Sequence, residues 1–176
     1  HNRSTLSGLV DLMLSVLRLT LIIEAVGVIF FSVYFMYQGY FTNWAEALFH
    51  AIFASVSAFT NAGFDLFGDS LTRFADDYVI LSIHIVLIIL GGIGFPVLIE
   101  CSEYLSTFHI KKKFRFSLFT KVTTATYFFL LVLGGIGFFL LEMDDLLSGK
   151  CWYEALFYSL FYSVSSRSAG FSIVDM

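Results

Sequence analysis

Two short polar loops in an otherwise apolar chain carry the residues whose types and spacing could do chemistry. The first reads SVSAFTNAGFD at residues 55–65, and the second reads SVSSRSAGFS at residues 163–172. Each contains a glycine, Gly63 or Gly170, which leaves the backbone free to turn its carbonyl oxygens inward without a side chain in the way. Carbonyl oxygens arranged like this can replace the water shell of an alkali cation. The loops are therefore candidates for a cation site built from backbone atoms.

A repeated apolar segment precedes each loop and would position it. Residues 44–57 (WAEALFHAIFASVS) and 152–165 (WYEALFYSLFYSVS) are identical at nine of fourteen positions, which indicates an internal repeat. Fourteen helical residues reach only about 21 Å, so each segment is predicted to enter a membrane as a short helix and turn back. The carbonyl end of such a helix points partial negative charge toward the loop, which favours a cation.

The two short helices are predicted to begin differently. Asn43 is a good N-cap for the first, and Glu46 stands three residues later in the capping-box position. Cys151 occupies the equivalent cap position of the second helix, so only the favourable interaction of Glu154 with the helix dipole is expected there.

Composition places the chain in a membrane. The 176 residues are 58% hydrophobic and only 14% charged, which leaves too little polar surface for a water-soluble protein. Residues 12–36, 78–100 and 119–141 are long and apolar enough to span a bilayer. We expect an all-α membrane protein of repeated units, each a span, a pore helix, a filter loop and a second span. About one and a half units are present, and the chain reads as a piece of a longer protein.

The charge distribution predicts the topology. Positive residues gather before or at the start of the first span and between the second and third, namely Arg3, Arg18, Lys111, Lys112, Lys113, Arg115 and Lys121. The positive-inside rule assigns the N-terminus and the loop 101–121 to the cytoplasm. The opposite side is acidic, which would concentrate cations there. The basic cluster is short and flanked by spans, so it is interpreted as a topology signal in contact with anionic lipid and not as a nucleic-acid site.

The order of these motifs resembles the membrane subunit of the Ktr/Trk/HKT potassium transporters, most closely the bacterial Ktr type. The resemblance rests on the W-x-E-A-L-F helices, the loops SVSAFTNAGFD and SRSAGFS, and the segment GGIGFPVLIE with the basic loop after it. It covers nearly the whole chain. Members of that family have four span–pore–span units around one potassium-selective pore, so the chain would hold the second unit and the first part of the third.

The resemblance implies a division of the chain and a set of filter residues. Residues 1–108 would form one complete unit with pore helix 44–58 and filter 59–65, residues 109–118 a basic cytoplasmic linker, and residues 119–176 a partial unit with pore helix 152–165 and filter 166–172. Backbone carbonyls of the filter would bind K⁺. The filter positions are Asn61, Ala62, Gly63 and Phe64 in the first loop and Ser168, Ala169, Gly170 and Phe171 in the second.

Cofactors and partners follow from the same resemblance. The transported ion would be K⁺, with Na⁺ a candidate coupling ion, and the protein would lie in the plasma membrane as a homodimer on cytoplasmic nucleotide-binding regulatory subunits of the RCK type. The basic loop from Lys111 to Lys121 would be a docking surface for those subunits. The gate would lie beyond this chain.

The side chains near the loops have predicted roles that follow from their charge or size. Arg167 would repel an ion on the axis, so it is expected to point away and to pair with a carboxylate or with carbonyls behind the filter; the alternative is a snorkelling surface arginine. Asp65 either attracts cations or caps the next turn. Phe64 and Phe171 are expected to buttress the filter. Glu24, inside the first span, indicates a polar contact or a water-facing position.

The glycines of a second repeated segment, the proline, the histidines and the cysteines are predicted to have structural roles and not to bind ions. The segment LGGIGF occurs at 90–95 and 133–138 and predicts close helix packing. Pro96 is predicted to kink or end its helix. His50 and His84 are expected to pack or hydrogen-bond rather than to bind metal. Cys101 and Cys151 lie on opposite sides and cannot form a disulfide with each other.

The same sequence features can be compared with four other functions. A sodium or mixed monovalent cation transporter of the same superfamily would carry the same motifs. A non-conducting assembly subunit would explain the spans but not the matched loops. A membrane enzyme would need a serine–histidine pair or paired aspartates at matching membrane depth. The chain has neither, so no enzyme activity is expected. A water channel would place Asn-Pro-Ala at the helix starts, and the one proline is Pro96.

Overall fold

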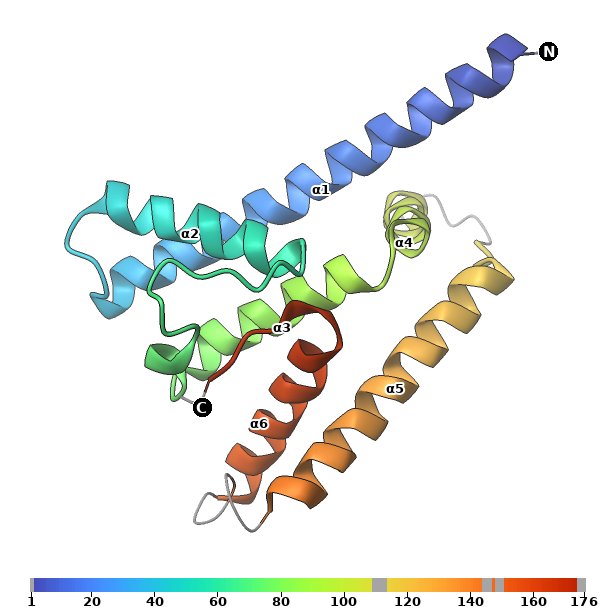
Figure 1. The fold of residues 1–176 in the computed structure, drawn as a ribbon. Helices are drawn as coiled ribbons and strands as arrows, with labels where there is room; N and C mark the ends of the chain where they lie inside the picture. The colour runs from blue at the N-terminus through green and yellow to red at the C-terminus, as the bar shows by residue number, and fades with distance from the viewer. Residues whose placement is uncertain (1, 109–113, 144–146, 148–150, 174–176) are drawn as a thin grey trace.

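The computed structural model describes residues 2–108, 114–143, 147 and 151–173, and the regular structure in these ranges is entirely helical. The elements are α1 (Asn2–Gln38), α2 (Trp44–Phe59), the 3-10 turn η1 (Thr72–Phe74), α3 (Tyr78–Gly92), α4 (Phe95–Phe108), α5 (Leu118–Glu142), α6 (Trp152–Val164) and the π-helical turn η2 (Ser165–Ala169). Two long helices, α1 and α5, are each followed by shorter ones (Figure 1). The predicted fold class, an all-α membrane fragment, is confirmed.

Helices α1 and α2 form the first hairpin. The predicted span 12–36 lies within α1, whose residues 8–38 are long and apolar enough to cross a bilayer. Helix α2 packs back along α1, and the Ser55 hydroxyl donates a hydrogen bond to the Glu24 carbonyl at 2.8 Å. Gly27 permits this approach, because a Cβ there would overlap the Ser55 Oγ. This bond involves the backbone of Glu24, and the polar contact or water-facing position expected for its side chain stays a prediction.

Helices α5 and α6 form a second hairpin with the same contacts. The predicted span 119–141 lies within α5. The Ser163 hydroxyl donates to the Leu131 carbonyl at 2.6 Å, and a Cβ on Gly134 would lie 2.7 Å from the Ser163 Oγ. In both hairpins the glycine follows the accepting carbonyl by three residues. The repeat found in residues 44–57 and 152–165 therefore extends into the long helices.

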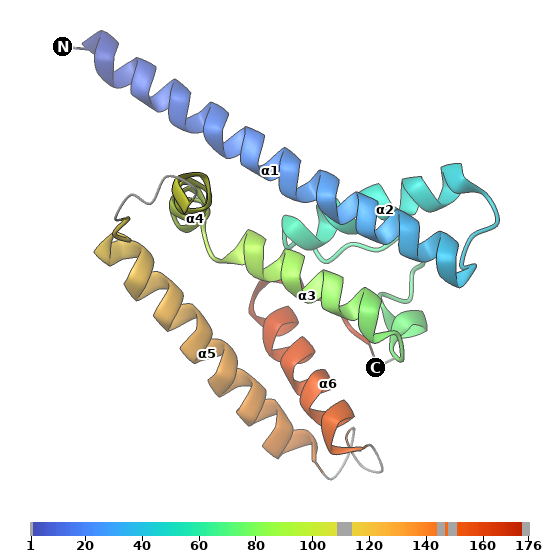
Figure 2. The same ribbon diagram turned by 180° about the vertical axis from the view of Figure 1, so that it is seen from behind.

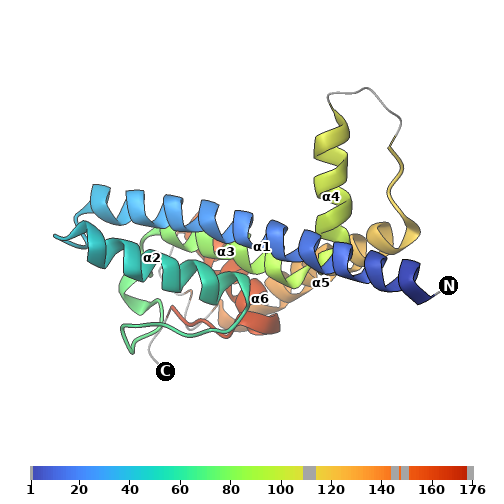
Figure 3. The same cartoon turned by 90° about the horizontal axis from the view of Figure 1, so that it is seen from above.

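The predicted span 78–100 is not one continuous helix. Helix α3 ends at Gly92, α4 begins at Phe95, and the two meet at an angle of 105°. Gly94 has φ +99°, a backbone conformation that side chains disfavour, and Pro96 lies in the first turn of α4, where its missing N–H costs nothing. The prediction that the helix kinks or ends beside Pro96 is confirmed, and the predicted span 78–100 corresponds to two helices that meet at this bend. Figure 3 shows α4 projecting away from the other helices.

Helix α3 is the central element and joins the two hairpins (Figure 2). Ile80, Leu81 and Ile88 on this helix are fully buried against residues of α1 and α6, including Phe31 and Phe161. At its carboxyl end, a Cβ on Gly91 would overlap the Phe59 carbonyl oxygen, so α3 passes directly against the end of α2. Close packing at the glycines of both LGGIGF segments, Gly91 and Gly134, is therefore confirmed.

The connection between α4 and α5 is described only in part. Lys111, Lys112 and Lys113 lie outside the described residues, as do the acidic residues 144 and 145. On the described side, the Glu100 carboxylate accepts a hydrogen bond from the Ser117 N–H at 3.0 Å, and the Ser117 hydroxyl caps α5 by accepting from the Thr120 N–H at 3.2 Å. These bonds fix the end of the basic linker next to α4.

Candidate functional site: two glycine loops

The first loop leaves its helix before the glycine. Helix α2 ends at Phe59, and the chain then turns through Asn61 and Gly63, which both adopt left-handed conformations with φ +55° and +70°. The Ala62 N–H still donates to the Ser57 carbonyl at 2.9 Å. The backbone beyond Ala62 is irregular, as the sequence predicts for a loop that opens after a short helix.

The second loop stays helical for longer. Residues Ser165–Ala169 form the π-helical turn η2, closed by a 2.8 Å hydrogen bond from the Gly170 N–H to the Ser165 carbonyl. Gly170 then adopts φ +73°. Ser168 and Ala169 therefore lie in a helical turn, and only Gly170 and the residues after it leave that turn; the assignment of both residues to the filter stays a prediction. The second loop has one residue fewer before its glycine, which shortens its irregular part.

The two loops touch. A Cβ on Gly63 would overlap the Ala169 carbonyl oxygen and lie 3.2 Å from the Ala169 carbonyl carbon, so the backbones of the two loops meet at these residues. The Ser168 hydroxyl also donates a hydrogen bond to the Asn61 Oδ1 at 3.0 Å. The residues that follow the loops are joined as well, because the Leu71 N–H donates to the Ser172 carbonyl at 2.9 Å.

A pair of serines that the sequence analysis does not single out anchors both loops in the same way. The Ser57 hydroxyl donates to the Phe64 carbonyl at 2.7 Å, and the equivalent Ser165 hydroxyl donates to the Phe171 carbonyl at 2.5 Å. Ser57 also accepts from the Phe64 N–H at 2.9 Å. Both serines are buried. A signal for them exists in the sequence, because each is the last serine of the identical S-V-S segments.

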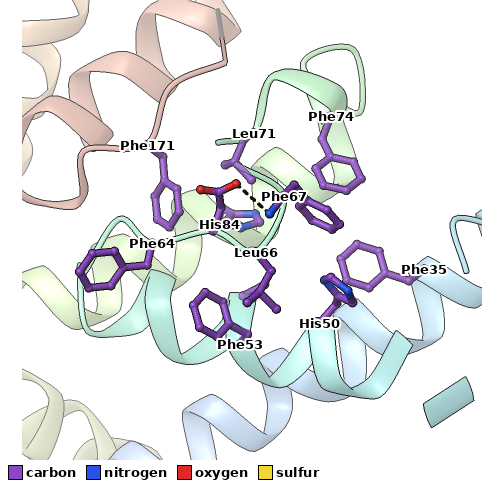
Figure 4. Close-up of a pocket in the computed structure, with 12 residues that line it drawn as sticks. Phe35, His50, Phe53, Phe64, Leu66, Phe67, Leu71, Phe74, His84 and Phe171 are labelled. Carbon is purple, nitrogen blue, oxygen red and sulfur yellow. Dashed lines mark hydrogen bonds between the residues drawn. The ribbon is translucent and has the colours of Figure 1, made fainter. Parts of the chain in front are cut away.

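The phenylalanines after the two glycines lie in different surroundings. Phe171 is buried, with its ring centroid 5.4 Å from that of His84, and so supports the second loop as expected. Phe64 is 67% exposed, so within this chain its side chain is not packed as that of Phe171 is, and its support of the first loop stays a prediction. Both line a small cavity of about 20 Å³ behind the first loop, to which α2 contributes His50 and α3 contributes His84 (Figure 4).

The histidines pack as predicted. His50 lies between the rings of Phe41 and Phe67, at centroid distances of 4.6 and 4.7 Å. The Nδ1 of His84 lies 2.9 Å from the Ile80 carbonyl on the same helix. Within the described ranges, no cluster of three or more His, Cys, Asp or Glu side chains could hold a metal ion.

Arg167 points away from the loop contact. Its Nη1 donates to the Tyr127 carbonyl on α5 at 3.1 Å, and its guanidinium lies 4.1 Å from the centre of the Tyr127 ring. A backbone carbonyl behind the loop is one of the two kinds of partner expected for it. The positive charge is thus held against a neighbouring helix and away from Gly63 and Gly170.

Side-chain oxygens of an asparagine and two carboxylates hold the starts of α2 and α6 and the turn that follows the first loop. Asn43 caps α2 as predicted, accepting from the Ala45 N–H at 3.0 Å. At α6 the Glu154 carboxylate accepts from the Cys151 N–H at 3.1 Å, so its role is a hydrogen bond as well as the expected dipole interaction. In the described chain no such bond joins Glu46 to Asn43. Asp65 caps the following turn, accepting from the N–H groups of Phe67, Gly68 and Ser70.

A cluster of polar side chains joins the carboxyl end of α1 to the start of α3. The hydroxyls of Tyr34 and Tyr40 donate to the Asp77 carboxylate at 2.9 and 2.7 Å, while Asp77 caps α3 by accepting from the Ile80 N–H. Partial burial and then the hydrogen bond to Asp77 raise the pKa of Tyr40 to about 12. The tyrosine therefore remains a hydrogen-bond donor throughout the physiological pH range.

Two apolar hairpins, each ending in a glycine loop that contacts the other, define a membrane protein with paired loops inside a helical bundle. The chain belongs to the TrkH family of cation transport proteins, which matches residues 2–176. It is a family of transporters and not of enzymes, as expected.

Curated relatives agree with this assignment. The chain is 44% identical over 176 residues to the Ktr system potassium uptake protein D of Bacillus subtilis, a match that covers 100% of the chain and 38% of that relative. It is 34% identical to the potassium/sodium uptake protein NtpJ of Enterococcus hirae, covering 99% of the chain and 37% of the relative. It is also 34% identical to the Ktr system potassium uptake protein B of Vibrio alginolyticus, covering 92% and 34%. The chain thus spans little more than a third of the length of these relatives.

Proposed function

We propose that the chain forms two filter segments of a channel-like pore that takes potassium ions into the cell. The observation that carries the proposal is the contact of Gly63 with the Ala169 backbone, between two loops whose glycines both have left-handed conformations. Family membership and relatives named as potassium uptake proteins support K⁺ as the transported ion.

The ion is proposed to meet backbone carbonyls. In the first loop these belong to Asn61, Ala62 and Gly63, and in the second to Ser168, Ala169 and Gly170. The partial negative charge at the carboxyl ends of α2 and α6 favours a cation at this point. Arg167 is proposed to support the second loop through Tyr127, and Glu46 and Glu154 to stabilise the starts of the two pore helices.

The wider assembly is part of the same proposal. The protein is proposed to lie in the plasma membrane with its N-terminus and residues 101–121 in the cytoplasm, following the positive charges. The name of a Ktr system supports a membrane component of a multi-subunit system, here a homodimer with cytoplasmic nucleotide-binding regulatory subunits of the RCK type. Na⁺ is a candidate coupling ion.

A sodium or mixed monovalent cation transporter is the second candidate, favoured by the potassium/sodium name of the relative from Enterococcus hirae. Both candidates use the same loops, and the ion preference of the full-length protein separates them. A protein that takes up Na⁺ as readily as a K⁺ analogue would support the second.

The test uses the full-length parent protein in cells that lack potassium uptake. Rubidium influx and its competition by sodium are measured for the wild type and for Gly63→Ser and Gly170→Ser. Gly137→Ser is the matched control, because this glycine lies in α5 and a Cβ added to it would meet no atom within 4 Å. We expect either loop variant to reduce the preference for potassium over sodium while the control keeps it. Unchanged preference in both loop variants would contradict the filter assignment.

A further inference from the structure

The side chain of Asn61 connects three elements at the contact between the loops. Its Nδ2 donates to the Phe59 carbonyl at the end of α2 at 3.3 Å, and its Oδ1 accepts from the Ser168 hydroxyl of η2 at 3.0 Å. Helix α3 approaches from a third direction, since a Cβ on Gly91 would lie 2.9 Å from the same Nδ2. Because the Phe59 carbonyl can only accept, the amide group is oriented with its oxygen toward Ser168.

The backbone of Asn61 also places this side chain. With φ +55°, Asn61 is in the left-handed region, which asparagine tolerates better than most residues. The conformation turns the loop immediately before Ala62 and Gly63. A residue that stabilises this turn therefore affects where the next two carbonyl groups lie.

The hydrogen bond between Asn61 and Ser168 lies next to the backbone contact between the loops. Ser168 precedes Ala169, whose carbonyl contacts Gly63, so the side-chain bond and the backbone contact join the same two short segments. It is a side-chain hydrogen bond that joins loops 55–65 and 163–172 directly. The two segments differ in length and conformation, so their alignment is not dictated by symmetry.

We propose that Asn61 and Ser168 form a positioning pair whose hydrogen bond sets the spacing of the two loops and thereby the preference among monovalent cations. This inference rests on the proposed function and adds a side-chain determinant to a site otherwise built from backbone. Discrimination between alkali ions depends on the number and arrangement of coordinating carbonyls. Without this bond, the two segments keep the hydrogen bond from Leu71 to Ser172 but lose the one at Asn61. The loop carbonyls can then adjust to a smaller ion.

The experiment removes each half of the pair in the full-length parent protein. Ser168→Ala removes the donor, and Asn61→Gly removes the acceptor while keeping a residue that accepts the left-handed backbone. A neutral hydrogen bond is worth enough to change the potassium-to-sodium preference about twofold to tenfold if it acts on one ion more than the other. We expect each variant to lower the preference by this factor, and the double variant to be no worse than the more severe single one.

Two further variants separate positioning from a general disturbance of the turn. Ser168→Thr keeps the hydroxyl and is expected to retain the wild-type preference. Ser82→Ala removes a hydroxyl of α3 that bonds the Tyr78 carbonyl of the same helix, outside both loops, and is also expected to leave the preference unchanged. All variants are compared at equal membrane abundance, measured by immunoblot.

The outcomes distinguish this inference from the proposed function. If the wild type takes up rubidium and the glycine variants lose preference, while Ser168→Ala, Asn61→Gly and the double variant all keep it, the positioning pair is overturned and the filter stands. Additive losses in the double variant would also overturn it, because they would show two independent effects. If the glycine variants keep their preference, the proposed function itself fails.

Discussion

In the loop 55–65 the helix ends at Phe59, four residues before Gly63. In the loop 163–172 helical structure continues to Ala169, the residue directly before Gly170. Both loops are nevertheless held at the same points. Ser55 and Ser163 bond to the preceding long helix, and Ser57 and Ser165 bond to the phenylalanine carbonyl after the glycine. The difference in length is thus absorbed between fixed anchors.

This comparison shows which parts of the repeat are constrained. The anchors occupy identical S-V-S positions, and the contacts they make are equivalent in the two hairpins. The residues between anchor and glycine differ in number, in conformation and in neighbours: Gly63 packs against the other loop, while a Cβ on Gly170 would meet nothing within 4 Å. The equivalent glycines should therefore respond differently to the same substitution.

The largest effect is expected for alanine at the two loop glycines. A left-handed conformation costs alanine about 1–2 kcal/mol at either position. At Gly63 the new methyl group would also overlap the Ala169 carbonyl, which belongs to the backbone and cannot rotate away. Gly63→Ala should therefore lower the melting temperature of the purified full-length protein in detergent much more than Gly170→Ala. Equal losses would mean that the contact between the loops is not maintained in the whole protein.

The second prediction addresses the anchors, where the two units should respond alike. Gly27→Ala and Gly134→Ala each force a methyl group against a serine hydroxyl, Ser55 or Ser163, and overpacking of this kind costs about 1–3 kcal/mol. We expect similar decreases in melting temperature for both. Gly137→Ala on α5 is the control without such a neighbour.

A combined variant identifies the cause of that loss. If the serine hydroxyl is the obstacle, Gly134→Ala together with Ser163→Ala should be less damaging than the sum of the two single changes. A strictly additive result, or a large difference between the Gly27 and Gly134 variants, would show that the hairpins are not equivalent at this level.

Much of this arrangement could be predicted from residue patterns. The W-x-E-A-L-F repeat identifies α2 and α6, Asn43 marks the start of α2, and Gly63 and Gly170 mark the turns. These features are local, because apolar periodicity, a capping side chain and a glycine each act within a few residues. The close approaches at Gly91 and Gly134 could also be anticipated, since small residues in apolar helices favour packing.

Other features depend on contacts that local patterns do not encode. The sharp break at Gly94 involves a left-handed glycine two residues before Pro96, so the proline alone predicts a kink where the chain in fact turns by 105°. The π-helical turn of Ser165–Ala169 resembles an irregular loop in sequence. Phe64 and Phe171 follow equivalent glycines, yet only Phe171 is buried, against partners such as His84. Each of these outcomes is decided by tertiary packing.

The smallest expected effects concern the starts of α2 and α6, where different residues cap the two helices. Asn43→Ala removes the side-chain cap of α2 and should destabilise the protein by about 0.5–2 kcal/mol. Alanine at the glutamate three residues after each cap tests the other half of the capping box. Both Glu46 and Glu154 lie in a first helical turn, but in the described chain only Glu154 accepts from a cap N–H.

Glu154→Ala should therefore cost more than Glu46→Ala, by about the 0.5–1.5 kcal/mol of one hydrogen bond, since both variants lose the same interaction with the helix dipole. Melting temperatures in detergent at matched pH and salt measure the difference. Cys151→Asn provides the reverse test, because Cys151 has an extended backbone that suits a cap, with φ −65° and ψ 151°. An asparagine there should stabilise α6 as Asn43 stabilises α2. A neutral or harmful result would indicate that the Glu154 bond already satisfies this helix start.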